Sequence, residues 1–363
     1  MLSTVCADAL IPLANDHVIA PIKASMDRLK SQKVLVTGGA GFIGSELVRQ
    51  LVAAGADVVV VDNLVNGKRE NLAGLDAARV RLVEEDMRSG EAMQALMQGV
   101  SHIFHLACLG VRHSIHAPRE NHDVNATATL DLLKIAKSTG VGRFINVSSS
   151  EVYGTARWVP MTEEHPTYPM TVYGAGKLAG ECYARAYWET YRYPTVVIRP
   201  FNAYGPRCHH EGDAGEVIPK FMLRAMVGLP LIVFGDGNQS RDFTYVEDTA
   251  SGIIRAGLSE RAVGRTINLG SGGEITINDL ARSILRIVGT GATRIEHDAP
   301  RPGDVLRLVA DTTQARELCG FAPRVGFDDG LARHLAWYRG RGVTAEQLLA
   351  SEIVRNWAAA IDV

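Results

Sequence analysis

The stretch from Val34 to Ser45 constrains the fold more than any other, because a short apolar run leads through closely spaced glycines into an amphipathic pattern. The turn holds Gly38, Gly39, Gly41 and Gly44, and the last three satisfy G-x-G-x-x-G. Glycines allow a tight turn, close backbone approach to a pyrophosphate, and packing of a helix on a strand. A helix beginning near Phe42 would turn its free N–H groups toward phosphates. The sequence therefore predicts a strand–turn–helix unit that binds a dinucleotide.

An acidic residue follows the next apolar run. Asp62 comes directly after the valines of 57–61 and 18 residues after Gly44. A carboxylate there accepts hydrogen bonds from both ribose hydroxyls and repels a 2′-phosphate, which favours NAD over NADP. Lys68 and Arg69 follow within a few positions and leave NADP as the alternative.

Short apolar runs alternate with amphipathic stretches from residue 33 onward. The expected strands are 34–37, 58–62, 80–84, 102–106, 143–147 and 195–198, and the expected helices are 42–54, 91–97, 120–138 and 172–191. Continuous apolar strands between amphipathic helices predict a parallel sheet covered on both faces. Right-handed crossovers then give an α/β, doubly wound parallel (Rossmann) sheet, with ligands beyond the carboxyl ends of its strands.

The chain divides into four predicted segments. These are an N-terminal arm at 1–31 with a helical pattern over 22–29, an NAD-binding Rossmann domain at 32–200, a smaller α/β substrate-binding domain at 201–340, and a C-terminal segment at 341–363 with a helix over 344–361. After Pro200 the alternation of strands and helices becomes less regular, and glycine- and proline-rich turns separate shorter elements. Part of 240–270, near 266–269, is expected to complete the sheet.

Composition excludes several classes of protein. The 363 residues are 46% hydrophobic and 21% charged with a formal net charge of −2, and the basic residues are scattered, which argues against a nucleic-acid partner. No apolar run approaches the roughly 20 residues of a membrane span, and the first residues lack the pattern of a signal peptide. Five dispersed cysteines without C-x-x-C spacing are typical of reduced thiols, so we expect a cytoplasmic protein.

A possible acid–base pair follows the strand at 143–147. Tyr173 and Lys177 are four residues apart, hence on one helical face, and the serines at 148–150 end the neighbouring strand. A phenol has a pKa near 10, and an ammonium group about one turn away favours phenolate. Alternatively, Tyr173 packs in a core and Lys177 is solvated. The glycine turn and Asp62 favour the catalytic interpretation.

Several motifs occur in one order along the chain. They are Thr37-Gly-Gly-Ala-Gly-Phe-Ile-Gly44, Asp62-Asn-Leu-Val-Asn-Gly67, Glu85-Asp86-Met87, His105-Leu-Ala107, Ser149 through Gly154, Tyr173 with Lys177, Arg199-Pro-Phe-Asn202, Arg241-Asp-Phe-Thr-Tyr-Val-Glu-Asp248 and Arg301-Pro-Gly-Asp304. Over residues 33–340 this order resembles the extended short-chain dehydrogenase/reductases, specifically the NAD-dependent nucleotide-sugar epimerases and dehydratases.

The resemblance implies a set of cofactor-binding residues. For NAD they are Gly38, Gly41, Phe42, Ile43, Gly44, Asp62, Asn63, Asn66, Gly67, Asp86, Met87, Leu106, Ala107, Tyr173 and Lys177. Asp86 and Met87 would hold the adenine, and Lys177 would bind the nicotinamide ribose.

It also implies contacts to a nucleotide-diphosphate sugar, with a UDP-sugar expected. The substrate-binding residues would be Arg112, Ser149, Ser150, Asn202, Val217, Arg241, Arg301 and Asp304. Asn202, Arg241 and Arg301 would meet the pyrophosphate, for which fork-shaped guanidinium groups are well suited. Alternatively, the last two are surface ion-pair residues. Arg112 would contact a phosphate or the carboxylate of a uronic acid.

By the same resemblance Ser149, Tyr173, Lys177 and Glu151 are the catalytic residues. Tyr173 as phenolate removes the sugar O4 proton while Ser149 hydrogen-bonds the same oxygen, which yields a 4-keto sugar. Reduction from the other face gives a 4-epimer, loss of the C6 hydroxyl a 4,6-dehydratase product, and loss of carbon dioxide a decarboxylated sugar.

The sequence favours epimerisation of a UDP-hexose or UDP-hexuronate without excluding the two lyases. Glu151 adds a carboxylate that dehydratases and decarboxylases use, whereas Ser150 replaces the aspartic acid of many dehydratases. The runs 62–67 and 110–115 look more like epimerases. A non-catalytic dinucleotide sensor is the remaining alternative, and it would need only the dinucleotide half.

Two histidine groups raise the question of a metal. His113 with His116, and His209-His210-Glu211, lack a third ligand at helical spacing, and we expect no metal. His105 at a strand end is expected to be packed and hydrogen-bonded. The resemblance further implies a homodimer in which helices near 120–138 and 172–191 pair with their copies.

Overall fold

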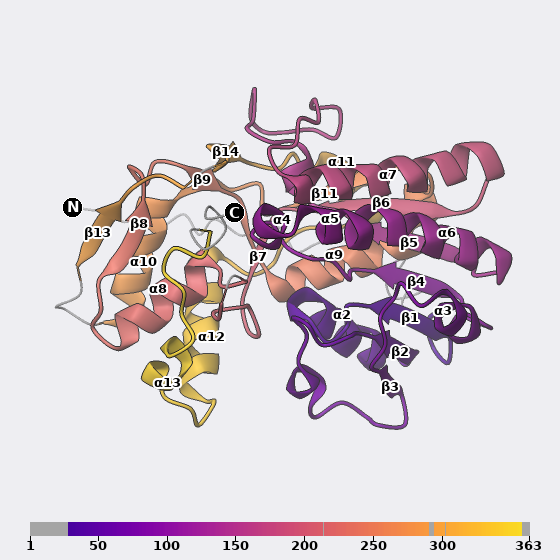
Figure 1. Cartoon of the computed structure of the whole chain (residues 1–363), viewed down its shortest axis with the longest axis horizontal. Helices are drawn as coiled ribbons and strands as arrows, with labels where there is room; N and C mark the ends of the chain where they lie inside the picture. Colours follow the sequence, from indigo (N-terminus) through magenta and orange to yellow (C-terminus); the bar gives the residue numbers. More distant parts are fainter. Residues whose placement is uncertain (1–27, 213, 290–293, 302, 358–363) are drawn as a thin grey trace, which may run out of the picture.

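The computed structural model describes residues 28–212, 214–289, 294–301 and 303–357. Its centre is a seven-stranded parallel sheet of strand order β11-β6-β5-β4-β1-β2-β3 (Figure 1). The strands are β1 (Lys33–Thr37), β2 (Asp57–Val61), β3 (Val80–Val83), β4 (His102–His105), β5 (Arg143–Val147), β6 (Thr195–Pro200) and β11 (Thr266–Leu269). The six predicted strands are confirmed to within two residues at each end, and so is the predicted return of the chain at 266–269.

Two apolar layers cover the sheet. On one face lie α2 (Phe42–Ala53), α9 (Val246–Leu258) and α11 (Thr313–Cys319), and on the other α3 (Gly90–Leu96), α6 (Ala128–Ser138) and α7 (Val172–Tyr191). The doubly wound Rossmann fold is therefore confirmed. Strand order reverses at β1, which lies between β2 and β4, and ligands of such sheets bind in the crevice beyond this point.

The helix predicted over 120–138 is interrupted. It consists of α5 (Pro118–His122), a π-helical turn at Asp123–Thr127, and α6. Asn121 and Asn125 turn their side chains inward, and both Nδ2 atoms donate to the Leu109 carbonyl, at 3.0 and 2.9 Å. These amides anchor the loop after β4, and such π turns are frequent near functional sites.

A second lobe holds most of the chain after Pro200 (Figure 1). Its helices are α8 (Val217–Met226), α10 (Ile277–Val288) and α12 (Phe327–Arg339), and they share an apolar core with the parallel pair β8 (Leu231–Phe234) and β13 (Ile295–Asp298). Its short strands are β7 (Asn202–Tyr204), β9 (Ser240–Arg241), β10 (Phe243–Tyr245), β12 (Ile275–Thr276) and β14 (Arg307–Leu308). The division at residues 200 and 340 stays a prediction.

The helix predicted over 344–361 is wrong for residues 350–357, and residues 358–361 lie outside the described part of the chain. Thr344 caps a short helix, α13 (Ala345–Leu349), through a reciprocal capping box with Gln347. Residues 350–357 continue in turns and extended backbone, where Glu352 forms an isolated bridge with Gly212. Contacts with the second lobe replace helical hydrogen bonds there. The predicted arm at 1–31, with its helical pattern over 22–29, lies mostly outside the described residues.

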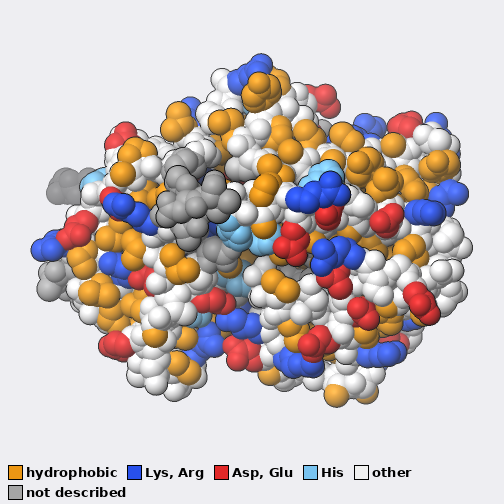
Figure 2. Space-filling model, viewed as in Figure 1, with side chains coloured by type: hydrophobic (Ala, Val, Ile, Leu, Met, Phe, Trp, Pro, Cys, Tyr) orange, Lys and Arg blue, Asp and Glu red, His pale blue; other side chains and the backbone are white. Residues whose placement is uncertain are grey.

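Ion pairs join the two lobes. Lys68 bonds to Glu211 at 2.6 Å and Arg207 to Glu46 at 2.5 Å. Acidic, basic and histidine side chains gather along the line where the lobes meet (Figure 2). Among the described residues, the structure contains no helix with the length and apolar character that crossing a membrane requires.

Candidate active site

A cavity of about 840 Å³ opens between the lobes at the carboxyl ends of the strands. The glycine turn forms one part of its wall, Ser149 and Tyr173 a second, and α8 with β9 a third. Its size is in the usual range of small-molecule sites, which is about 300–1,000 Å³. The cavity therefore lies where the strand order predicts a ligand.

The glycine turn has no room for side chains. A Cβ on Gly44 would lie 2.1 Å from the Gly38 carbonyl oxygen, and one on Gly38, at φ +71°, would lie 2.7 Å from the backbone of Ala107. Helix α2 follows with Gly41 as its N-cap, which offers no side chain to the first N–H groups. Those groups remain suited to an anion such as a pyrophosphate.

Asp62 ends β2 at the cavity. Its carboxylate accepts backbone N–H bonds from Ala40 and Leu64, both at 2.9 Å, and burial raises its pKa. A carboxylate has about four acceptor positions, so two remain for ribose hydroxyls. Lys68 and Arg69, which left NADP open, are paired with Glu211 and Glu84. Each of these cations thus already has a carboxylate partner.

The remaining predicted cofactor residues line the same part of the cavity. They are Phe42, Ile43, Asn63, Asn66, Gly67, Asp86, Met87, Leu106 and Ala107. The Asp86 carboxylate is held by Arg88 at 2.7 Å and by Asn63 at 3.2 Å, and the Arg88 bonds lower its pKa to about 2. Asp86 is thus an ionised acceptor beside the cavity.

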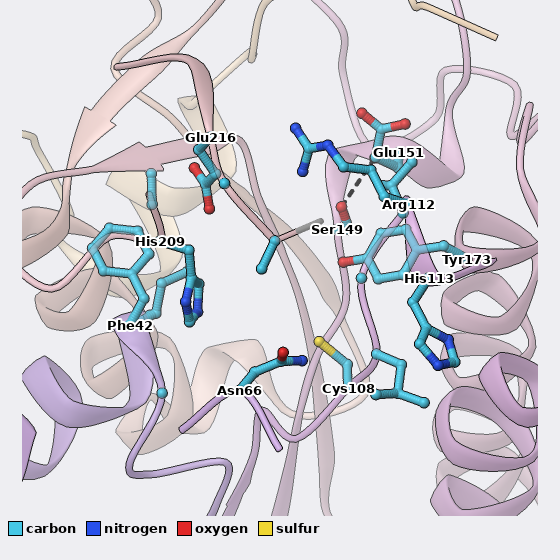
Figure 3. Close-up of a pocket in the computed structure, with 18 of the residues that line it drawn as sticks. Phe42, Asn66, Cys108, Arg112, His113, Ser149, Glu151, Tyr173, His209 and Glu216 are labelled. Atoms are coloured by element: carbon cyan, nitrogen blue, oxygen red, sulfur yellow. Dashed lines mark hydrogen bonds between the residues drawn. The ribbon is translucent and has the colours of Figure 1, made fainter. Parts of the chain in front are cut away.

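Helix α7 carries Tyr173 and Lys177 into the cavity. Thr171 caps this helix by accepting the Gly174 N–H at 3.1 Å, so that Tyr173 lies in its first turn. Lys177 is buried and donates to the Val147 carbonyl at 2.6 Å, which ties α7 to the end of β5. Figure 3 shows the Tyr173 hydroxyl pointing into the cavity beside Ser149, opposite Glu216 and His209.

The expected lowering of the Tyr173 pKa by Lys177 is not what the structure shows. Burial raises the pKa of Tyr173 well above its usual value, and the neighbouring Ser149 hydroxyl only partly opposes this. Burial also lowers the pKa of Lys177, whose ammonium is engaged by a backbone carbonyl. Desolvation of the phenolate is therefore the largest influence on the pKa of Tyr173.

The predicted diphosphate arginines share one carboxylate. Arg241 and Arg301 each lie 2.8 Å from Asp304 Oδ1, and Arg241 is only 7% exposed, so it is not a surface ion-pair residue. Glu151 lines the cavity within the field of both arginines; burial is the largest influence on its pKa and raises it. These groups form a charged wall next to Ser149.

The other predicted substrate residues divide into two groups. Arg112, Asn202 and Val217 line the cavity. The Asn202 Oδ1 atom is buried and has no hydrogen-bond partner within the described part of the chain, as expected of an acceptor reserved for a ligand. Ser150, in the first turn of a short helix at Ser150–Val152, is buried and does not line the cavity.

Sequence reasoning missed several cavity residues. Cys108, His209, Glu216 and Lys220 are among them, as are residues of the C-terminal segment. Lys220 stands three residues after the predicted Val217 on α8, so helical spacing could have identified it. No pattern could have identified the C-terminal residues, because they reach the cavity only through tertiary contacts.

The histidines take ordinary structural partners. His105 is buried between Thr37 and Thr129, at 2.8 and 3.0 Å, which confirms its predicted packed role. His113 lies 3.4 Å from Glu120, and His209 and His210 face Glu211. Over the described ranges, no group of three or more His, Cys, Asp or Glu side chains is arranged to hold a metal ion.

Residues 35–334 match the family model described as GDP-mannose 4,6 dehydratase. The chain is 36% identical over 313 residues to a UDP-glucose 4-epimerase of Mycolicibacterium smegmatis, a match that covers 85% of this chain and 99% of the relative.

Solved structures of nucleotide-sugar epimerases and dehydratases also resemble this chain. The dTDP-glucose 4,6-dehydratase DesIV from Streptomyces venezuelae, solved with NAD bound, has a TM-score of 0.80 at 36% identity over 85% of this chain and 98% of that one. A UDP-glucose 4-epimerase from Thermotoga maritima, solved with UDP-glucose, has a TM-score of 0.80 at 32% identity over 85% of this chain and 99% of that one. The chain therefore belongs to the GDP-mannose 4,6 dehydratase-type family of extended short-chain dehydrogenase/reductases, and is an enzyme of the isomerase or lyase class.

Proposed function

We propose that the protein is an NAD-dependent 4-epimerase of a UDP-hexose or UDP-hexuronate that acts through a transient 4-keto sugar. The observation that carries this proposal is the Ser149–Tyr173 hydroxyl pair, which faces the cavity between the glycine turn and the arginine wall. The epimerases among the relatives support the same choice.

NAD is the cofactor that the dinucleotide half fits. The side-chain-free turn at Gly38 and Gly44 would receive the pyrophosphate, and Asp62 would accept the adenosine ribose hydroxyls. Lys177 would contact the nicotinamide ribose. Bound oxidised NAD would supply a positive ring and the acceptor for the hydrogen that leaves C4.

The chain's own groups then have distinct tasks. Ser149 would hydrogen-bond the sugar O4, and Tyr173 would take the O4 proton and later return it. Arg241 and Arg301 would bind the diphosphate, held in place by their shared contact with Asp304. The sugar could then turn about its diphosphate anchor and be reduced from its other face.

A lyase is the second candidate, and two carboxyl groups favour it. Glu151 and Glu216 both line the cavity, and burial raises the pKa of each. A carboxyl group that stays protonated closer to neutral pH can act as a general acid, as dehydration requires. Ser150 argues the other way, because no acid stands at that position and its side chain does not line the cavity.

Mass spectrometry of products from a panel of nucleotide sugars tests the proposal. A 4-epimerase leaves the mass of its substrate unchanged, whereas a dehydratase removes about 18 Da and a decarboxylase about 44 Da. We expect an isomer of unchanged mass from a UDP-sugar, without net consumption of NAD. A product lighter by either amount would contradict epimerisation and establish the lyase.

Binding of the proposed substrate should depend on pH, because Lys220 lines the same cavity. Burial, with Arg112 nearby, lowers the pKa of Lys220 to about 8. Its positive charge is present below pH 8 and is lost above it, so an anionic diphosphate binds more weakly as pH rises. We expect the Kd for UDP to rise about tenfold between pH 7 and 9 in the wild type. A Lys220→Arg variant should lack this rise, because arginine stays charged; equal profiles would contradict the prediction.

The homodimer and the cytoplasmic location stay predictions. In the proposed dimer, α5, α6 and α7 would pair with their copies; Val172 and Tyr191 of α7 are exposed apolar residues that could lie in such an interface. Light scattering of the purified protein would give twice the 39.2 kDa of one chain. A mass of one chain at micromolar concentration would contradict this assembly.

A further inference from the structure

The described chain ends at the cavity. The family match stops at residue 334, yet the segment 351–357, here called the C-terminal strap, continues across the second lobe. Glu352, Val354, Asn356 and Trp357 of this strap all line the cavity. Part of the wall is thus built by residues beyond the family match.

Ion pairs hold the strap on the second lobe. Arg224 of α8 bonds to Glu352 at 2.7 Å, and both side chains are largely buried. Arg355 donates two hydrogen bonds, of 2.5 and 2.9 Å, to the carboxylate of Asp298 at the end of β13. Lys220 also donates to a strap carbonyl at 2.7 Å. Anchors at three points fix where Trp357 lies.

Trp357 forms an aromatic corner with Phe234 at the end of β8. The ring centroids are 4.5 Å apart and the planes meet at 84°, and Trp357 is 8% exposed. Phe234 is half-buried, so its ring and the uncovered part of the Trp357 ring together offer an aromatic surface on which a flat heterocycle can pack. Gln239 and Asn356 line the same cavity, and their amide nitrogens donate to the Phe234 and Gly215 carbonyls, at 2.8 and 3.4 Å, which holds both side chains in this part of the wall.

The order of groups along the cavity identifies the part of the ligand that reaches this corner. The sugar end lies at Ser149 and Tyr173, and Glu151 beside it is within the field of Arg241 and Arg301. Two residues before Arg241, Gln239 donates to the Phe234 carbonyl at 2.8 Å. A nucleoside diphosphate sugar with its diphosphate on the arginines would therefore extend its base toward Phe234.

We propose that Trp357 packs, with Phe234, against the nucleobase of the nucleotide-sugar substrate, and that it determines affinity for the nucleoside part. This inference rests on the proposed substrate class and is independent of whether the enzyme epimerises or eliminates. Because the dinucleotide half of the cavity is formed by the other lobe, Trp357 should not affect NAD binding.

Calorimetric titration of the NAD-loaded enzyme with UDP, dTDP, CDP, GDP and ADP tests the assignment. For the tightest of these, Trp357→Ala and Trp357→Leu should raise the Kd about 5- to 100-fold, the usual effect of removing a base-stacking ring. Trp357→Phe should stay within about threefold of the wild type, because it keeps an aromatic face. The leucine variant separates stacking from apolar packing.

Inorganic pyrophosphate serves as the matched probe. It would occupy the arginines without reaching the corner, so its Kd should be the same in the wild type and in all Trp357 variants. Trp158→Ala, which changes an exposed tryptophan outside the cavity, should leave every Kd unchanged.

Other outcomes separate the two proposals. Unchanged affinity of Trp357→Ala for the nucleoside diphosphate, or equal losses for pyrophosphate and nucleotide, would overturn the role of Trp357 while leaving the proposed function intact. A wild-type enzyme that binds NAD but none of the nucleoside diphosphates would overturn both.

Discussion

Replacing Tyr173 by phenylalanine is expected to lower turnover by at least about a hundredfold while changing NAD affinity no more than a few-fold. The substitution removes one hydroxyl, which faces the cavity beside Ser149. Without it, no phenolic group remains to take the O4 proton. The ring stays, so the dinucleotide contacts of Lys177 and the glycine turn should persist. Turnover with the active UDP-sugar and calorimetric titration with NAD measure the two quantities.

Tyr191→Phe is the matched control, because Tyr191 ends the same helix and is 55% exposed. Its turnover should equal that of the wild type. Retained turnover in Tyr173→Phe would remove the phenol from the mechanism. Loss of both turnover and NAD binding would point instead to damage of the fold.

Replacing Glu181 by leucine is expected to destabilise the protein by about 3–5 kcal/mol, since it leaves a buried guanidinium without its counter-charge. Glu181 is fully buried in α7, and Arg199 of β6 is 3% exposed. Two bonds of 2.6 and 2.9 Å join them. Ser148, at the end of β5, donates to the same carboxylate at 2.6 Å. The cost arises because Arg199 is buried, and the other groups that it bonds, the Tyr153 hydroxyl and the Glu163 carbonyl, are uncharged.

Urea unfolding followed by tryptophan fluorescence measures the change in stability. Glu189→Leu is the control on the same helix: Glu189 and its partner Arg192 are both mostly exposed, and such surface pairs contribute little. An unfolding midpoint of Glu181→Leu equal to that of the wild type would contradict the prediction. Because Ser148 precedes Ser149, we also expect the variant to be less active than its folded fraction allows.

The sheet was predictable because its signal is local. Each strand is a short run of valine, isoleucine and their like, and burial on both faces makes such runs continuous rather than alternating. The glycine turn was predictable for a similar reason. At Gly38 and Gly44 a single Cβ would collide with backbone, so only glycine fits at these two positions. Helical spacing paired Tyr173 with Lys177, resemblance assigned the role of Ser149, and the structure brings all three to one cavity.

The predictions that failed concern properties that depend on tertiary contacts. The predicted C-terminal helix over 344–361 ends at Leu349, because contacts with α8 and β13 hold the following residues more firmly than helical propensity could. The predicted depression of the Tyr173 pKa failed because desolvation depends on what surrounds the ring, and sequence spacing does not report that. Ser150 was grouped with its neighbours, yet a short helix turns it away from the cavity.

By itself the sequence determined the doubly wound sheet, the dinucleotide turn and the family, because these depend on steric rules and on spacing within one element. Only the tertiary structure decided which charges share a carboxylate, which phenol is desolvated, and that Trp357 reaches Phe234 from the far end of the chain. Those properties depend on distances between residues remote in sequence, and packing of the whole chain sets them.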